Sequence, residues 1–283
     1  MAKTDVALVT GASRGIGKGI ALALGSTGAT VYVTGRSTRG GGQSLPGCVE
    51  ETADLVSAAG GKGIALKCDH GDDEQVAAVF RRIVDEAGTL NLLVNNATTL
   101  PRALVGTGGF WERSLELADM FDVGLRSAYV ASCHAATLMT SARSGLIASI
   151  SFYGSVSYFH GPAYGAQKAG LDKMMSDMAE DLEPHHVAAL SLWPGFVRTE
   201  KVVARWSGQR GGDERLASYE TPQYTGLVLA ALLHDPVLMT LSGQTVIAAE
   251  YGLNAGIADL DGKQPHSYRE TMGAPHNFPR GRQ

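Results

Sequence analysis

The segment Val6-Ala7-Leu8-Val9-Thr10-Gly11-Ala12-Ser13-Arg14-Gly15-Ile16-Gly17 decides the fold of this chain. Its apolar run breaks into glycines and then into a helical pattern, which predicts a strand, a tight turn and the start of a helix. Because glycine lacks a Cβ atom, Gly11, Gly15 and Gly17 allow a sharp turn, the close approach of a pyrophosphate and tight packing of the helix on the strand. The N–H groups at the start of the helix then face the phosphates. We therefore expect a dinucleotide site here, with a purely structural strand-to-helix turn as the alternative.

The length of the chain is enough for one large α/β domain or for two small ones, and the order of the motifs described below favours one. The 283 residues are 44% hydrophobic and 18% charged, with a formal net charge of −4. These values are typical of a soluble globular protein and give no basic surface for nucleic acid. The cysteines Cys48, Cys68 and Cys133 lie far apart without a CxxC pattern, which favours core thiols and a reducing, cytoplasmic compartment.

No segment is expected to cross a membrane. The first strand begins almost at once, which leaves no room for a signal peptide. The longest uncharged run, residues 127–142, is shorter than a bilayer span of ~20 residues. We expect this run to be a buried helix.

The second predicted strand, residues 30–34, ends in Gly35-Arg36-Ser37. In dinucleotide folds an acidic residue about 20 positions after the glycine loop binds the ribose hydroxyls, whereas an arginine accommodates a 2′-phosphate. Gly35 occupies the place of that acid, Arg36 follows it, and Arg14 lies within the glycine loop. Two guanidinium groups favour NADP(H) over NAD(H). The alternative is that Arg36 is a solvated surface charge.

Hydrophobic periodicity predicts an alternation of strands and helices along the rest of the chain. Glycine-rich loops are expected at residues 38–47 and 99–109. Phe110 and Trp111 after the second loop either shield a nucleotide or anchor the following helix, and we favour the anchor. Further strands are expected at residues 63–67, 90–94, 146–151, 187–193 and 244–248, and helices at 49–59, 74–86, 163–182 and 223–234.

Five motifs follow one another along the chain: Thr10-Gly11-x-x-x-Gly15-x-Gly17, Asn95-Asn96-Ala97, Ser151, Tyr164-x-x-x-Lys168 and Pro194-Gly195-x-Val197-x-Thr199. In kind and order they resemble the motifs of the classical short-chain dehydrogenase/reductase family. The segments Asp122–Arg126, Ser191–Gly195 and Asp261–Lys263 further resemble the subgroup typified by dehydrogenase/reductase SDR family member 1.

The resemblance implies a single Rossmann-type, doubly wound domain over residues 1–263. Its sheet would be predominantly parallel and seven-stranded, with helices on both faces. Residues 200–220 would form a substrate lid. Residues 264–283 would be a C-terminal tail that is either disordered or crosses a subunit boundary.

The resemblance also implies a set of cofactor-binding residues. Asp69 would contact the adenine amino group with the His70 backbone beside it, although Asp69 could instead, or in addition, cap the helix that starts near Asp72. Backbone groups of Pro194 and Val197, with the Thr199 hydroxyl, would hold the nicotinamide carboxamide. The full set is Gly11, Ser13, Arg14, Gly15, Ile16, Gly17, Arg36, Asp69, His70, Asn96, Tyr164, Lys168, Pro194, Gly195, Val197 and Thr199.

Tyr164 and Lys168 are the strongest candidates for chemistry. They are four residues apart and therefore share one face of a helix. A neighbouring ammonium favours the phenolate, which we expect to lower the phenol pKa from its usual ~10. The family places Ser151 at the substrate oxygen. We therefore expect hydride transfer between NADP(H) and a carbonyl or secondary alcohol, as in a carbonyl reductase, with Tyr164 as general acid/base.

Two positions depart from the family pattern. Gly124 stands where the family has an asparagine that is often counted as a fourth catalytic residue, and Thr98 replaces a glycine. The relay water of the family binds the backbone carbonyl at that position, which glycine retains. An active oxidoreductase and a catalytically weakened nucleotide-binding regulatory protein both stay open. A methyltransferase would not explain the Tyr–Lys pair.

Aromatic residues near Ser151 predict an apolar substrate. Phe152, Tyr153, Tyr158 and Phe159 would wall the pocket. The helix at 163–182 carries extra apolar residues, which in the family form a helix bundle between subunits; core packing is the alternative. We therefore expect a homodimer or homotetramer, and no metal site at the histidine pair 185–186.

Overall fold

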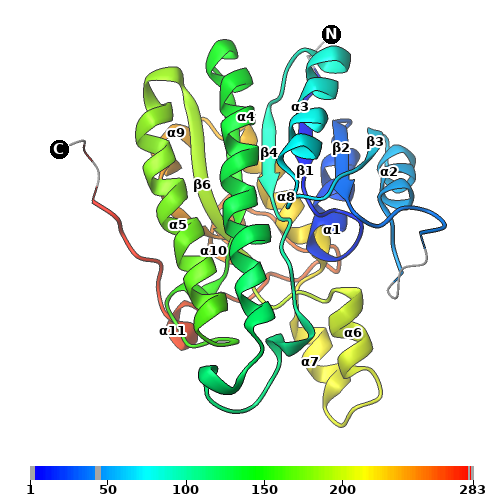
Figure 1. Cartoon of the computed structure of the whole chain (residues 1–283), viewed down its shortest axis with the longest axis vertical. Coiled ribbons are helices and arrows are strands. Elements are labelled where there is room, and N and C mark those ends of the chain that lie inside the picture. Colours follow the sequence, from blue (N-terminus) through cyan, green and yellow to red (C-terminus); the bar gives the residue numbers. More distant parts are fainter. Residues whose placement is uncertain (1–3, 42–45, 280, 282–283) are drawn as a thin grey trace.

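Seven parallel strands form one sheet in the order β3-β2-β1-β4-β5-β6-β7 (Figure 1). The computed structural model describes residues 4–41, 46–279 and 281, so part of the loop expected at 38–47 lies outside the described residues. Every residue of β1, β4, β5 and β6 is buried, as expected for a parallel sheet covered on both faces. The strands are β1 (Val6–Val9), β2 (Thr30–Gly35), β3 (Lys62–Lys67), β4 (Leu92–Asn95), β5 (Gly145–Ile150), β6 (Val187–Trp193) and β7 (Thr245–Ile247).

Helices cover both faces of the sheet. One face packs against α1, α2 and α8 through Leu24, Val56 and Val228. The other packs against α3, α4 and α5, where Phe80 and Met175 are buried. The helices are α1 (Gly15–Ser26), α2 (Val49–Ala58), α3 (Asp73–Ala87), α4 (Ser127–Ala142), α5 (Pro162–Leu182), α6 (Glu200–Trp206), α7 (Gly212–Ser218), α8 (Pro222–Leu233), α9 (Leu238–Leu241), α10 (Ala248–Ala255) and α11 (Arg269–Met272), with a π-helical turn η4 (Phe121–Arg126) before α4.

This architecture confirms the doubly wound, seven-stranded Rossmann-type fold. The predicted strands and helices are present, with ends that differ by at most two residues. The chain builds β1, β2 and β3 outward and then crosses back to place β4 beside β1. In open parallel sheets, ligands bind at the carboxyl ends of the strands where the order reverses in this way. The glycine loop after β1 and Asn96 after β4 both lie at that point.

The start of α3 corrects one expectation. Asp72 caps this helix, because its side chain accepts hydrogen bonds from the backbone N–H groups of Glu74 and Gln75. The alternative that Asp69 is the cap is therefore wrong. Asp69 instead accepts a hydrogen bond from Gly71 N.

Burial corrects three further expectations. Of the expected core thiols only Cys68 is buried, whereas Cys48 is half-buried and Cys133 is exposed. The run 127–142 forms α4 but buries only part of its surface, because Tyr129 is exposed on it. Phe110 and Trp111 anchor no helix: both rings are exposed and border an open cavity of about 500 Å³ together with Tyr158.

Residues 264–269 pack on the same domain. Gln264 donates hydrogen bonds to the Tyr224 hydroxyl and to Ala249 O, and Tyr268 N donates to the Tyr153 hydroxyl. Arg269 forms an ion pair with Glu250. In the part of the chain that the structure describes, no helix is both long and apolar enough to cross a bilayer.

Candidate active site

Asn96 fixes the glycine loop from the neighbouring strand end. Its Nδ2 donates to Thr10 O at 2.8 Å and to Gly11 O at 3.0 Å. A Cβ atom on Gly17 would collide with the Asn96 amide and lie 2.7 Å from Gly11 O, so only glycine fits there. The tight cradle leaves the N-terminus of α1 directed at the crevice, which suits a pyrophosphate. Ser13 is buried beside Gly35, and Ile16 packs against the core, so both support the loop.

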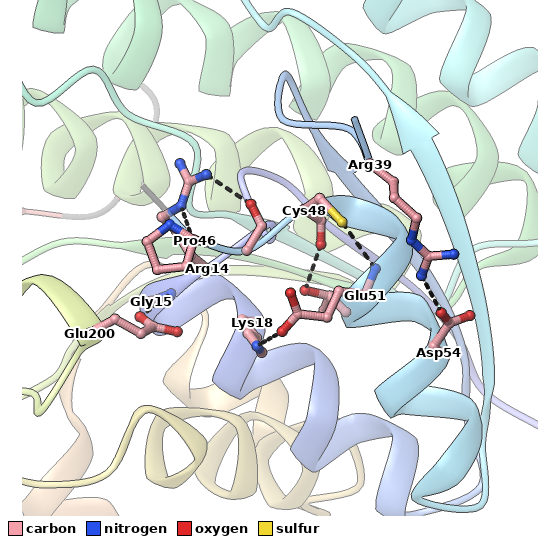
Figure 2. Close-up of polar contacts among 11 residues, drawn as sticks. Arg14, Gly15, Lys18, Arg39, Pro46, Cys48, Glu51, Asp54 and Glu200 are labelled. Carbon is pink, nitrogen blue, oxygen red and sulfur yellow. Dashed lines mark hydrogen bonds and ion pairs between the residues drawn. The ribbon is translucent and has the colours of Figure 1, made fainter. Parts of the chain in front are cut away.

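Arg14 bridges the glycine loop and the segment after β2 (Figure 2). Its guanidinium donates to Ser37 Oγ at 2.9 Å, to Pro46 O at 2.9 Å and to Gly47 O at 2.8 Å. Arg36 directly follows β2, with its side chain 65% exposed and its Nη1 3.9 Å from Asp69 Oδ2. Arg14 and Ser37 therefore meet after the end of β2, and the sequence analysis had not singled out Ser37.

Glu200 places a carboxylate at the glycine loop. Gly15 N donates to Glu200 Oε2 at 2.9 Å, although the two residues are 185 positions apart (Figure 2). Glu200 opens α6, the first helix after the Pro194–Thr199 motif. The sequence offered no signal for this contact.

His70 is a buried, neutral residue at the end of β3. Its Nε2 lies 2.8 Å from Thr34 Oγ1. Burial lowers the pKa of His70 to about 4 because the imidazolium would lose its hydration. His70 therefore supports the end of β2 through this contact with Thr34.

Ser151, Tyr164 and Lys168 come together at the carboxyl end of β5. Lys168 Nζ donates to Ile150 O at 2.9 Å, and Ser151 Oγ donates to Lys168 O at 3.2 Å. The ammonium lies 5.7 Å from the centroid of the Tyr164 ring. Ser151 and Lys168 are 1% and 7% exposed, so the polar cluster is shielded from bulk water.

The expected lowering of the Tyr164 pKa is wrong for this structure. Burial raises the pKa of the phenol above its usual value and lowers the pKa of Lys168 to about 8. Desolvation disfavours the charged form of each group, the phenolate of Tyr164 and the ammonium of Lys168. The pair therefore rests as a neutral phenol beside a lysine that can exchange protons near neutral pH.

Asp172 extends this face of α5 by one more turn and was missed by the sequence analysis. It is 5% exposed, and Trp193 Nε1 donates to both carboxylate oxygens at 3.2 Å. Its negative charge raises the pKa of Lys168, against the effect of burial. The spacing of Tyr164, Lys168 and Asp172 at i, i+4 and i+8 was the available signal.

A buried carboxyl group holds the Pro194–Thr199 loop. Gly195 N donates to Glu220 Oε2 at 3.1 Å, and Arg198 N donates to Glu220 O at 2.8 Å. Burial raises the pKa of Glu220 to about 8. Thr199 Oγ1 accepts from Val202 N and thereby caps α6. Sequence reasoning had missed Glu220.

Aromatic rings line the site, but they differ in part from the expected set. Phe152 and Phe159 contact Phe196, which also stacks on Tyr219 at 5.2 Å. Tyr153 is fully buried in the core and Tyr158 is 83% exposed, so neither is an enclosed wall. Among the described residues, no group of three His, Cys, Asp or Glu side chains could hold a metal ion.

Comparison with known proteins identifies the family. The family model for short chain dehydrogenases matches residues 5–210. Human dehydrogenase/reductase SDR family member 1 is 35% identical over 276 residues, which cover 93% of this chain and 86% of that protein. The 3-oxoacyl-(acyl-carrier-protein) reductase of Pseudomonas aeruginosa is 36% identical over 197 residues, covering 69% and 74% of the two chains.

The fold is also found in solved structures. A mutant short-chain dehydrogenase/reductase from Serratia marcescens aligns with a TM-score of 0.71 and 30% identity, covering 86% of this chain and 95% of that one. Members of this family are oxidoreductases that use nicotinamide cofactors. The chain therefore belongs to the short-chain dehydrogenase/reductase family, in the subgroup of dehydrogenase/reductase SDR family member 1.

Proposed function

We propose that this protein is an NADP(H)-dependent oxidoreductase that interconverts a carbonyl group and a secondary alcohol. The observation that carries the proposal is the shielded cluster of Ser151, Tyr164 and Lys168 at the end of β5. A phenol, a hydroxyl and an ammonium in one water-poor site are suited to proton transfer at a reacting oxygen.

The residues at the crevice fit a phosphorylated dinucleotide. The glycine loop has no room for a Cβ at Gly17, and the N-terminus of α1 suits the diphosphate. Arg14, Ser37 and Arg36 would hold a 2′-phosphate, because Gly35 offers no carboxylate to repel it. When bound, NADPH supplies the hydride for reduction. Asp69, His70, Asn96 and the Pro194–Thr199 loop complete the proposed cofactor site.

The chain's own groups handle the substrate oxygen and its proton. In reduction the neutral Tyr164 phenol gives its proton to the alkoxide oxygen that develops on the substrate. Ser151 Oγ donates a hydrogen bond to the same oxygen, so both groups stabilise its charge. Lys168 stabilises the resulting phenolate and returns a proton to it. In oxidation the proton moves in the opposite direction.

The surroundings of Tyr164 favour an apolar carbonyl compound or alcohol. Phe152, Phe159 and Phe196 form the nearest wall, and α6 with α7 would close over it as the lid of residues 200–220. The domain would comprise residues 1–263. The tail from residue 264 would stabilise it, since Tyr268 packs on Phe196.

We further propose a homodimer or homotetramer that works in the cytoplasm. Tyr129 on α4 is exposed, as a face between subunits would be in an isolated chain. A single-chain mass in light scattering would contradict the assembly. The proposed cytoplasmic location is based on three unpaired cysteines, which suit a reducing environment.

Substitution of the phenol tests the activity. Tyr164→Phe removes one hydroxyl, so we expect turnover of NADPH with ketones, aldehydes and quinones to fall at least about 100-fold, the usual range for a lost general acid. Calorimetric titration should show nearly unchanged NADPH binding. Tyr158→Phe is the matched control, because it removes the same atom from an exposed ring. Tight NADPH binding by the unaltered protein without turnover of any carbonyl would favour the regulatory alternative.

A further inference from the structure

His160, in the loop before α5, has a backbone conformation that is uncommon away from helix ends. Its φ is +59°, in the left-handed region that residues other than glycine seldom enter. Among the residues that the structure describes, two other non-glycine residues share this conformation, Arg143 and His186. Both close the end of a helix, where a left-handed residue is ordinary. No helix ends at His160, so neighbouring groups must hold its conformation.

Arg113 holds His160 in place. Its guanidinium donates to His160 O at 3.0 Å, to Ala103 O at 2.9 Å and to Leu104 O at 2.7 Å. Gly161 follows with φ +95°, and a Cβ atom there would lie 2.6 Å from Arg113 Nη1, so only glycine lets the guanidinium come this close. The loop after β4 is thereby tied to the loop before α5.

The imidazole of His160 lies beside the proposed catalytic tyrosine. Its ring centroid is 5.4 Å from that of Tyr164, with the two rings edge to face, and 4.1 Å from that of Phe159. His160 is half-buried, and among the described residues neither of its ring nitrogens has a hydrogen-bond partner. Its polar atoms are therefore available to a molecule bound at Tyr164.

The imidazole is uncharged near neutral pH. Burial lowers the pKa of His160 below its usual value, and the positive charges of Arg113, Arg205 and Lys201 lower it further. Arg205 and Lys201 belong to α6, within the proposed lid. A neutral imidazole has one N–H donor and one acceptor nitrogen, so it can pair with either a hydroxyl or a carbonyl oxygen.

We propose that His160 is a specificity-determining residue that hydrogen-bonds a second oxygen of the substrate, one or two carbons from the carbonyl that Tyr164 protonates. This role rests on the oxidoreductase function proposed above, and it narrows the substrate class to hydroxyketones and dicarbonyl compounds with an apolar remainder. With ring centroids 5.4 Å apart, the two side chains can reach two neighbouring oxygens of one small molecule. Hydride and proton transfer at the reacting carbonyl are unchanged.

Three ketones of equal chain length test this preference. They are 2-hexanone, which has no second oxygen, and its 3-hydroxy and 4-hydroxy derivatives, which place a hydroxyl one or two carbons from the carbonyl. One net hydrogen bond between neutral groups corresponds to about three- to tenfold in a rate or binding constant. We therefore expect kcat/KM of the unaltered protein to exceed that for 2-hexanone by this factor with at least one hydroxyketone.

Three substitutions separate hydrogen bonding from effects on the backbone. His160→Phe keeps an aromatic ring but removes both nitrogens, so the ratio of the kcat/KM values should fall to about one. His160→Asn keeps a donor and an acceptor, and asparagine tolerates a positive φ, so most of the preference should remain. His186→Phe is the matched control, because His186 has φ +55° but is exposed before the amino end of β6, away from the site. It should leave the kcat/KM values unchanged.

Binding measurements distinguish a failure of this role from a failure of the proposed function. Ligand-observed NMR of the full chain with oxidised cofactor measures affinity for the three ketones without turnover. If binding shows the preference and His160→Phe removes it while no ketone is reduced, the role stands and the oxidoreductase function fails. Equal kcat/KM for the three ketones, or a preference that persists in His160→Phe, would overturn the role of His160 alone. A protein that neither binds nor reduces any of them would overturn both.

Discussion

Replacing Arg36 by alanine should weaken NADPH much more than NADH, because only NADPH carries a 2′-phosphate. A hydrogen bond to a charged group contributes about 1.5–3 kcal/mol, which corresponds to about 10- to 150-fold in affinity. The side chain of Arg36 is 65% exposed, and the Asp69 carboxylate 3.9 Å away partly neutralises its charge. Screening by solvent therefore places the expected loss at the lower end, about tenfold for NADPH.

Arg14 should have a larger but less selective effect. Its guanidinium is held at the edge of the glycine loop by hydrogen bonds to Ser37, Pro46 and Gly47. Arg14→Ala also frees those three partners and disturbs the edge of the glycine loop. We therefore expect NADH affinity to fall as well, and Arg36 gives the cleaner test.

Isothermal titration calorimetry with each cofactor measures both losses directly. Arg39→Ala is the matched control: it removes an arginine with a similarly exposed side chain, 67%, whose guanidinium is paired with Asp54 at 2.7 Å. This variant should bind both cofactors as the unaltered protein does. Equal losses of NADPH and NADH affinity in Arg36→Ala would remove the case for phosphate recognition at the end of β2.

Two further predictions concern charges near the cofactor and the lysine. Glu200→Gln removes the negative charge of the carboxylate that accepts from Gly15 N and would repel the phosphates of NADPH. NADPH affinity should therefore rise several-fold at low salt and by less at high salt. A loss of affinity in the same titration would mean that Glu200 helps to bind the cofactor. If reduction needs the charged lysine, kcat should fall as pH rises through about 8, the pKa of Lys168. Asp172→Asn removes a negative charge that raises this pKa, so the fall in kcat should move to lower pH. An unchanged pH profile in the variant would exclude a role for the charge of Lys168 in the reaction.

The sheet and the motif positions were predictable because they depend on local signals. β6 and α4 match the expected ranges residue for residue, since β6 is a short, mostly apolar run and α4 is a long uncharged one. Contacts between distant segments left no such signal. Gly15 with Glu200 and Gly195 with Glu220 each pair a backbone N–H with a carboxylate from a loop or short helix, and only the tertiary fold decides which carboxylate arrives.

Gly124 shows how a departure from a family pattern can be misjudged from sequence. The sequence analysis counted the missing asparagine as a source of doubt about the proton relay. The structure gives the glycine a reason, because the backbone at φ +147° disfavours any side chain and Gln167 already reaches the space beside it.

The same limit explains the pKa values of the proposed catalytic pair. Spacing along a helix shows that Tyr164 and Lys168 are neighbours, but the sign of a pKa shift depends on how deeply both are buried, which spacing does not report. With the pKa of the phenol raised and that of Lys168 lowered to about 8, the resting pair holds its proton on the tyrosine. A neutral phenol is the form needed to protonate an alkoxide, whereas oxidation of an alcohol needs the phenolate. In the proposed reaction, the raised pKa therefore leaves Tyr164 in the form that protonates an alkoxide, and oxidation of an alcohol would first require charge brought in with the cofactor to lower that pKa.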